Sequence, residues 1–354
     1  MVPEAQSGIW VRSHSAGLRP IEEVLLHLLP VALLAFAAAA IGTRAMIPWL
    51  ASRGALAHEN ERTLHKGIVP KGGGLPLLMA ALGATALLFP LGEIPSALLT
   101  GLMLVMAVSW LDDTAPLPAR VRFPVHIAAA AILILTLPRQ ALVFQGLVPL
   151  WADRALAILT LTWMMNLFNF MDGINGIAGA ETMSIAGGYL LVGAVVPGGV
   201  SLAPLSAALL GATAGFLIWN LRERGEAAVF MGDIGSVPLG YLTGAMMIDL
   251  AVRGHWVPAL ILPAYFLADA TLTLLKRMAR GEKFWQAHKS HFYQRAAEAL
   301  GNKHLPVVWR ISAANATLLA CALWGVSFPL PALIAAAITV TLLLILLSVA
   351  RVQA

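Results

Sequence analysis

Long runs of apolar residues alternate with short polar segments along almost the whole chain. A helix that crosses a membrane needs about 20 mostly apolar residues, within a range of about 17–25, and the runs are of that order. The candidate spans lie at residues 25–47, 74–91, 97–111, 124–138, 155–171, 177–196, 200–219, 236–252, 257–275, 306–326 and 329–350. The pattern predicts an all-α integral membrane protein, a polytopic bundle of ten or eleven transmembrane helices.

Composition supports one membrane domain over residues 1–354, without a separate soluble domain. Hydrophobic residues make up 59% of the chain and charged residues 12%, whereas an average soluble domain carries about 25% charged residues. The single cysteine, Cys321, lies in an apolar run, which excludes an internal disulfide. The first apolar run is too long for a signal-peptide core, which favours an uncleaved first span. The order of residues 1–20 is left open.

Lysine and arginine are divided unevenly between the predicted loops. All 23 of them lie on one side of the bundle except Arg12, Arg19, Arg139, Arg154 and Arg253. Because basic loops stay in the cytoplasm, that side is predicted to be cytoplasmic, with the N-terminus in the periplasm and the C-terminus in the cytoplasm. The segment 276–305 is predicted to be a basic, histidine-containing cytoplasmic loop. The net charge of +5 reflects these loops and gives no indication of nucleic-acid binding.

The stretch from Asn166 to Glu181 is a polar interruption between two apolar runs. Asn169, Asp172 and Asn175 recur three residues apart, so a helical or near-helical backbone keeps them on roughly one face. Glycines at 173, 176 and 179 let the backbone turn tightly and approach a ligand. A polar ligand at a membrane surface explains such a cluster, which a packed core does not need.

Two acidic motifs fall on the same predicted side. Asp112 and Asp113 end the third span, where the helix dipole disfavours negative charge, so they invite a cation. The alternative is a pair of solvated acids at a helix end. Asp233, in Met231-Gly-Asp-Ile-Gly-Ser236, opens the eighth span, where free N–H groups suit a metal–phosphate group. The alternative there is an ordinary helix cap.

Basic and histidine residues on this side could bind phosphate. Lys71 precedes three glycines and belongs either to a phosphate cradle or to a linker. His288 and His291 point the same way on a helix, with Arg295 one turn further. They fit a metal site, a helix resting on lipid headgroups, or a pyrophosphate clamp, and phosphate contact is favoured.

Asp269 and the pair Arg120 and Arg122 each allow two interpretations. Asp269 lies in the ninth span, seven residues before Lys276, and is either an intramembrane ion-pair partner or a catalytic group. Arg120 and Arg122 follow the acidic pair. They either hold a lipid phosphate or simply follow the positive-inside rule.

Four motifs together resemble the polyprenyl-phosphate N-acetylhexosamine-1-phosphate transferase superfamily. They are Leu111-Asp-Asp113, Asn166-Leu-Phe-Asn-Phe-Met-Asp-Gly-Ile-Asn-Gly-Ile-Ala-Gly179, Gly232-Asp-Ile-Gly-Ser236 and His288-Lys-Ser-His291. They occur in the family's order and cover about residues 44–300. The resemblance implies transfer of a sugar 1-phosphate from a UDP-N-acetylhexosamine to undecaprenyl phosphate, with release of UMP, in the bacterial inner (cytoplasmic) membrane.

The resemblance also implies roles for individual residues. Asp233 would be the main ligand of Mg²⁺, or of Mn²⁺ in its place, with Asp112 assisting. Asp112 and Asp113 would deprotonate or orient the lipid phosphate, without a distinction between them. The implied nucleotide and substrate contacts come from Lys71, Asn169, Asp172, Asn175, His288, His291 and Arg122.

Two departures point to one branch of the family. The branch that makes the MurNAc-pentapeptide lipid usually has consecutive histidines in the last loop and an aspartate where Asn175 stands. The spaced His288 and His291, followed by Phe-Tyr-Gln-Arg295, resemble the branch that starts O-antigen and related surface polysaccharides. The sugar would then be GlcNAc or a 6-deoxy N-acetylhexosamine.

Three other classes of function are alternatives. A transporter would also use intramembrane acids, but it predicts polar residues at mid-bilayer and symmetry-related halves. An integral phosphatase fits the position of the site but not the Asn169–Asn175 cluster. A membrane scaffold fits the composition alone. Besides membrane lipids and the two substrates, a homodimer partner is compatible with the sequence.

Overall fold

The structure is a computed structural model that describes residues 21–53, 56–57, 69–90, 92, 94–222, 227–282 and 288–350. Side chains are described in all of these except residues 21–25 and 56–57. The order of residues 1–20 and the middle of the basic segment 276–305 therefore lie outside the described residues.

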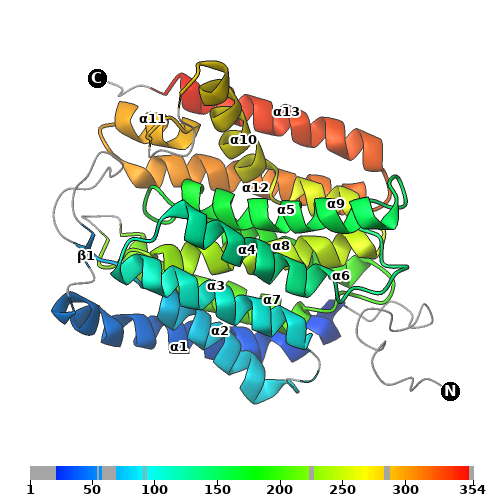
Figure 1. Ribbon diagram of the computed structural model, residues 1–354, viewed down its shortest axis with the longest axis horizontal. Coiled ribbons are helices and arrows are strands. Elements are labelled where there is room, and N and C mark those ends of the chain that lie inside the picture. The colour runs from blue at the N-terminus through cyan, green and yellow to red at the C-terminus, as the bar shows by residue number, and fades with distance from the viewer. Residues whose placement is uncertain are drawn as a thin grey trace.

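Helices make up nearly all of the regular structure, and the predicted all-α fold class is confirmed (Figure 1). The helices are α1 (Ile21–Ser52), α2 (Gly74–Leu88), α3 (Ser96–Thr114), α4 (Ala119–Ile134), α5 (Leu150–Met171), α6 (Ile177–Val195), α7 (Ala203–Asn220), α8 (Asp233–Val252), α9 (Trp256–Ile261), α10 (Ala264–Ala279), α11 (Phe292–Ala299), α12 (His304–Gly325) and α13 (Pro329–Ser348). Two short strands, β1 (Leu56–Ala57) and β2 (Val69–Pro70), pair antiparallel.

Many of these helices are suited to a membrane. In the described part of the chain, seven are long and apolar enough to cross one, namely α1, α3, α6, α7, α8, α12 and α13. The helix α2 is apolar but shorter, while α4 and α5 run alongside the others in the same bundle. The chain is thus a multi-pass membrane protein.

One predicted span is wrong as a single helix. Residues 257–275 form α9 and α10, which are separated at Leu262 and Pro263. Proline has no N–H to donate, and its ring clashes with the carbonyl four residues earlier, so the helix breaks there. Figure 1 shows α10 steeply inclined to its neighbours. The predicted basic loop after it contains the short helix α11.

The helix α8 is the centre of the bundle. Every residue from Ile234 to Ala251 is buried, and the helix packs against α2, α3, α5 and α6. A helix that is enclosed on all sides can be apolar around its whole circumference. Its first residue, Asp233, is therefore held at one end of the bundle by helices on several sides.

Buried ion pairs close the opposite end of the bundle, where α5 begins and α8 ends. Asp153 pairs with Arg154 at 2.8 Å and accepts a hydrogen bond from the backbone N–H of Phe144 at 2.8 Å. Asp249 pairs with Arg253 at 3.1 Å. These groups satisfy one another, so their task is structural.

Candidate active site

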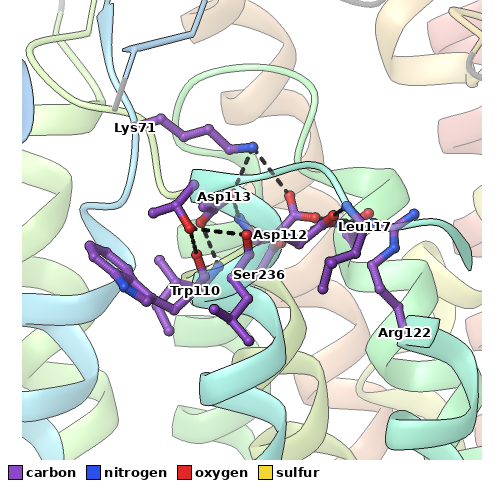
Figure 2. A network of polar contacts seen from close by, with 12 residues as sticks. Lys71, Trp110, Asp112, Asp113, Leu117, Arg122 and Ser236 are labelled. Atoms are coloured by element: carbon purple, nitrogen blue, oxygen red, sulfur yellow. Dashed lines mark hydrogen bonds and ion pairs between the residues drawn. The ribbon is translucent and has the colours of Figure 1, made fainter. Parts of the chain in front are cut away.

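Five charged side chains, which we call the charged cluster, meet where α3 ends and α8 begins. They are Lys71, Asp112, Asp113, Arg122 and Asp233 (Figure 2). Lys71 reaches the cluster from the segment before α2, and Arg122 reaches it from α4 on the opposite side. Asp113 and Asp233 are 120 residues apart in sequence. The fold thus joins motifs that lie far apart along the chain.

Asp113 caps the N-terminus of α8. Its Oδ1 accepts a hydrogen bond from the N–H of Asp233 at 2.9 Å, and its Oδ2 accepts one from the N–H of Ile234 at 2.9 Å. The first N–H groups of a helix lack partners within the helix, and here a carboxylate from α3 accepts their hydrogen bonds. Lys71 completes the arrangement, with Nζ 2.7 Å from Oδ1, and the Asp113 side chain is 3% exposed. Both carboxylate oxygens of Asp113 are therefore engaged by other groups of the protein.

Gly232, the residue before α8, makes this cap possible. Its φ is +77°, a backbone conformation that favours glycine, and a Cβ here would lie 2.6 Å from Oδ2 of Asp113. A side chain at this position would therefore displace the Asp113 carboxylate from the helix end.

Asp112 faces away from the cap and toward Arg122. Its Oδ2 is 2.5 Å from Nη1 of Arg122, and its Oδ1 accepts a hydrogen bond from the N–H of Leu117 at 2.6 Å. The Asp112 and Asp233 carboxyl groups lie within hydrogen-bonding reach of each other. Arg122 is also 3.4 Å from Oδ2 of Asp233, while Lys71 is 3.7 Å from Oδ1 of Asp233. Asp233 thus lies between two cations, with its side chain 18% exposed.

Lys71 remains a cation in this position. Burial alone would lower its pKa, but the carboxylates of Asp233 and Asp113 outweigh that effect and raise the pKa of Lys71 above its usual value. Its place is fixed by a bridge to Phe230, whose N–H donates to the carbonyl of Pro70 at 2.8 Å.

The glycines after Lys71 serve packing in this structure. The N–H groups of Gly72 and Gly73 donate to the Phe230 carbonyl at 3.1 and 2.9 Å, and that of Gly74 donates to the Met231 carbonyl at 2.9 Å. These amides therefore do not form the open phosphate cradle suggested by the sequence. A Cβ on Gly74 would lie 2.1 Å from the Cα of Gly235, so the segment packs directly against the first turn of α8.

The polar end of α5 lies beside Asp233. Asn169 donates from Nδ2 to the hydroxyl of Ser236 over 3.2 Å. Asp172 follows the last residue of α5. The pKa of Asp172 is raised well above its usual value because its carboxyl is withdrawn from water and because Asp233 lies nearby.

The α5–α6 turn is held by residues that the sequence did not single out. The Asn175 N–H donates to Nδ1 of His304 at 3.2 Å, and the Gly176 N–H donates to Oδ1 of Asn220 at 2.7 Å. Asn220 is buried and also donates from Nδ2 to the Val229 carbonyl at 2.9 Å. Because both residues lie far from the turn in sequence, no local pattern indicated this role.

His126 on α4 is a further polar residue that the sequence reading missed. It follows Arg122 by four residues, so the two lie on one helix face, and it lies beside Asn166. The His126 side chain is buried, and its Nδ1 has no hydrogen-bond partner in the described part of the chain. The spacing of Arg122 and His126 was the available signal. Arg120 is exposed.

The predicted histidine pair lies at the N-terminus of α11. The rings of His288 and His291 are stacked, with centroids 4.9 Å apart. Nδ1 of His291 lies 3.1 Å from Oδ1 of Asp269, so the carboxylate of α10 is paired with a histidine. Lys276, its expected ion-pair partner, instead lies over the Phe292 ring at 4.4 Å. The helix α11 contacts the end of α5 and the α5–α6 turn, which carries Asp172.

The cluster offers donors for a divalent cation. Among the described residues, no three carboxylate or imidazole groups form a complete metal cage. Asp112 and Asp233 nevertheless bring carboxylate oxygens together. Mg²⁺ retains several waters, so one or two carboxylates and a substrate phosphate are enough to hold it. The residues present therefore fit a cation bound by Asp112 and Asp233.

A family model described as glycosyl transferase family 4 matches residues 95–251. The matched segment contains α3 to α8 almost completely. It includes every residue of the charged cluster except Lys71.

Three relatives resemble the chain over most of its length. It is 26% identical over 266 residues to a probable undecaprenyl-phosphate N-acetylglucosaminyl 1-phosphate transferase of Bacillus subtilis (strain 168), and the aligned part covers 71% of this chain and 72% of the relative. It is 27% identical over 341 residues to a decaprenyl-phosphate N-acetylglucosaminephosphotransferase of Mycobacterium tuberculosis (strain CDC 1551 / Oshkosh), and the aligned part covers 85% of this chain and 82% of the relative. It is 28% identical over 275 residues to a phospho-N-acetylmuramoyl-pentapeptide-transferase of Chlamydia pneumoniae, and the aligned part covers 67% of this chain and 76% of the relative.

Proposed function

Because the chain belongs to the polyprenyl-phosphate N-acetylhexosamine-1-phosphate transferase superfamily, we propose that it transfers an N-acetylhexosamine 1-phosphate from a UDP-sugar to undecaprenyl phosphate. UMP and an undecaprenyl-diphosphate-linked sugar are the products. The spaced His288 and His291 favour the branch that begins O-antigen or a related surface polysaccharide. The reaction would take place at the cytoplasmic face of the bacterial inner membrane.

The observation that carries this proposal is the charged cluster. Three aspartates and two cations from distant parts of the chain meet at one end of a membrane bundle. Phosphoryl transfer depends mainly on positioning and on neutralising charge. A lipid acceptor also requires the site to lie near the headgroups, and the end of a bundle satisfies that requirement.

The contacts of the two adjacent aspartates support different tasks for them. Asp112 faces Arg122, which would bind the acceptor phosphate while Asp112 takes its proton. The acceptor oxygen becomes bonded to the phosphorus of the sugar 1-phosphate, and the bond from that phosphorus to UMP breaks. Lys71 stabilises the charge on the departing UMP. Both Asp113 oxygens are engaged by α8, so Asp113 positions Asp233 and does not act as the base.

The remaining predicted residues would bind the donor. Asn169, Asp172 and Asn175 would hold the nucleotide at the α5–α6 turn, and His288 and His291 would contact the sugar diphosphate. Mg²⁺, or Mn²⁺ in its place, held by Asp233 and Asp112, would neutralise the diphosphate and polarise its phosphorus–oxygen bonds.

A second candidate is the transfer of phospho-MurNAc-pentapeptide in cell-wall synthesis. The similarity to the Chlamydia pneumoniae protein supports it. Asn175 and the separated histidines argue for the first candidate. The two differ only in the donor, so one assay distinguishes them.

The test is a donor panel with the purified protein. The protein would be incubated with undecaprenyl phosphate, Mg²⁺ and, one at a time, UDP-GlcNAc, a UDP-6-deoxy-N-acetylhexosamine and UDP-MurNAc-pentapeptide, with UMP release measured. We expect UMP with one of the first two donors and none without the lipid. Release only with the pentapeptide donor would support the second candidate. No release with any donor would reject the enzyme proposal.

A further inference from the structure

A carboxylate from α10 fixes the N-terminus of α11. Asp269 is fully buried. Its Oδ1 accepts a hydrogen bond from the N–H of Phe292 at 3.1 Å, and its Oδ2 accepts one from the N–H of Tyr293 at 3.2 Å. Two side chains of its own helix complete the arrangement, with the Tyr265 hydroxyl at 3.1 Å and the Thr273 hydroxyl at 3.3 Å. Asp269 therefore satisfies N–H groups that α11 cannot satisfy itself.

The same carboxylate orients His291. Its Oδ1 is 3.1 Å from Nδ1 of the imidazole. A carboxylate only accepts hydrogen bonds, so Nδ1 carries the proton and Nε2 is the nitrogen left for a ligand. The ring is further confined because it stacks on His288 at 4.9 Å and on Tyr293 at 5.7 Å.

The helix α11 is also tied to the turn that carries Asp172. The Tyr293 hydroxyl donates to the Phe170 carbonyl at 3.0 Å. A Cβ on Gly173 would lie 2.3 Å from the Tyr293 oxygen and 2.8 Å from Nε2 of Gln294, so the helix and the turn are in direct contact. Burial, Asp269 and Asp172 raise the pKa of Tyr293 well above its usual value, which keeps the hydroxyl as a donor.

We propose that Asp269 is a positioning residue that holds His291, with Nε2 free, and α11 in place against the Asp172 turn for the donor sugar diphosphate. The inference rests on the proposed function. Asp269 touches no substrate and acts through His291 and α11. A purely structural carboxylate would need the helix-end contacts alone and would not require the imidazole.

The test compares Asp269→Asn, His291→Gln and the double variant in the full-length protein. In Asp269→Asn, an NH₂ group replaces one of the two oxygens that accept hydrogen bonds. This NH₂ group would face N–H or O–H donors and could not accept from them. We expect Asp269→Asn to lower kcat/KM for the UDP-sugar by roughly 100-fold, with the KM for undecaprenyl phosphate unchanged. His291→Gln should have a similar effect, and the double variant should be no worse than the stronger single one.

Thr273→Val is the matched control. It removes one donor, at the long distance of 3.3 Å, from the same carboxylate without touching His291 or α11, so kcat/KM should stay close to that of wild type. Calorimetric binding of UDP and the Tm in detergent would be measured for every variant, which separates loss of donor binding from loss of folding.

Several outcomes would overturn the inference. One is that the Asp269→Asn and His291→Gln effects multiply in the double variant. Another is that Thr273→Val is as damaging as Asp269→Asn, or that Asp269→Asn lowers the Tm while kinetic constants per folded molecule stay normal. If wild type turns over normally, these results reject the positioning role alone. If wild type releases no UMP with any donor, the proposed function fails and this inference fails with it.

Discussion

Two adjacent aspartates in the charged cluster have different environments because successive residues of a helix point about 100° apart. Asp113 faces α8 and accepts its terminal N–H groups, whereas Asp112 faces α4 and pairs with Arg122. At the scale of single residues, these different contacts support the proposal that Asp113 positions Asp233 while Asp112 reacts. The family resemblance did not distinguish them.

Substitution of each aspartate should separate these tasks. We expect Asp112→Asn to lower turnover by about 10²–10⁴-fold, the range for loss of a general base, with little change in Tm. Asp113→Asn should lower stability by about 0.5–2 kcal/mol, the range for loss of a helix cap, and should lower turnover by displacing Asp233. UMP release and thermal unfolding in detergent would measure both effects. An unchanged Tm for Asp113→Asn, with Asp112→Asn still active, would contradict this division.

At the scale of elements, helix N-termini around the site are held by groups from other helices. Asp113 of α3 serves α8, Asp269 of α10 serves α11, and Asn220 of α7 serves the start of α6. Because a helix end leaves N–H groups without partners, each such contact both satisfies a donor and fixes two helices together. A site built on rigid elements keeps its groups in place more accurately than one built on loops.

Gly232→Ala tests this arrangement at the α8 terminus. The positive φ and the 2.6 Å approach to Asp113 should make alanine destabilising by about 1–3 kcal/mol, and turnover should fall as Asp233 shifts. Gly83→Ala in α2 is the control, since a Cβ there meets nothing within 4 Å. Alanine at 83 should be neutral or stabilising by up to about 1 kcal/mol. Equal stability of the two variants in thermal unfolding would show that the cap geometry is unimportant.

At the scale of the whole molecule, the proposed chemistry lies at one end of the bundle, which we call the chemical end, and buried ion pairs lie at the other. Figure 1 shows α11 and β1 at the end of the bundle where α3 finishes. The charged cluster lies at the same end, because Asp112 and Asp113 are in the last turn of α3. The other end carries the Asp153–Arg154 and Asp249–Arg253 pairs. We expect the chemical end to face the cytoplasm, because the basic residues of the predicted loops gather there.

Labelling of introduced cysteines would measure this orientation. Arg120 is exposed at the chemical end, Leu147 is 85% exposed in the segment between α4 and α5, and Cys321 is buried. In a Cys321→Ser background, Leu147→Cys should react with a membrane-impermeant maleimide in intact spheroplasts. Arg120→Cys should react only after permeabilisation. The reverse pattern would place the site on the periplasmic side.

The apolar runs and the positions of the polar motifs were enough to predict the class of fold and the neighbourhood of the candidate site. The length and apolarity of a run are local properties, so the helices were predictable, as was the gathering of the acidic and histidine motifs toward one side. The local pattern also led to a wrong expectation for one helix, because Pro263 divides a run that composition alone presents as continuous.

The contacts of each polar group became apparent only in the folded chain. It assigned Asp113 to the α8 terminus, Asp269 to His291 instead of Lys276, and the amides of Gly72–Gly74 to the carbonyls of Phe230 and Met231. The physical reason is that a helix end or a buried carboxylate must find hydrogen-bond partners wherever the folded chain supplies them. Those partners lie on other helices, so spacing along the sequence does not reveal them.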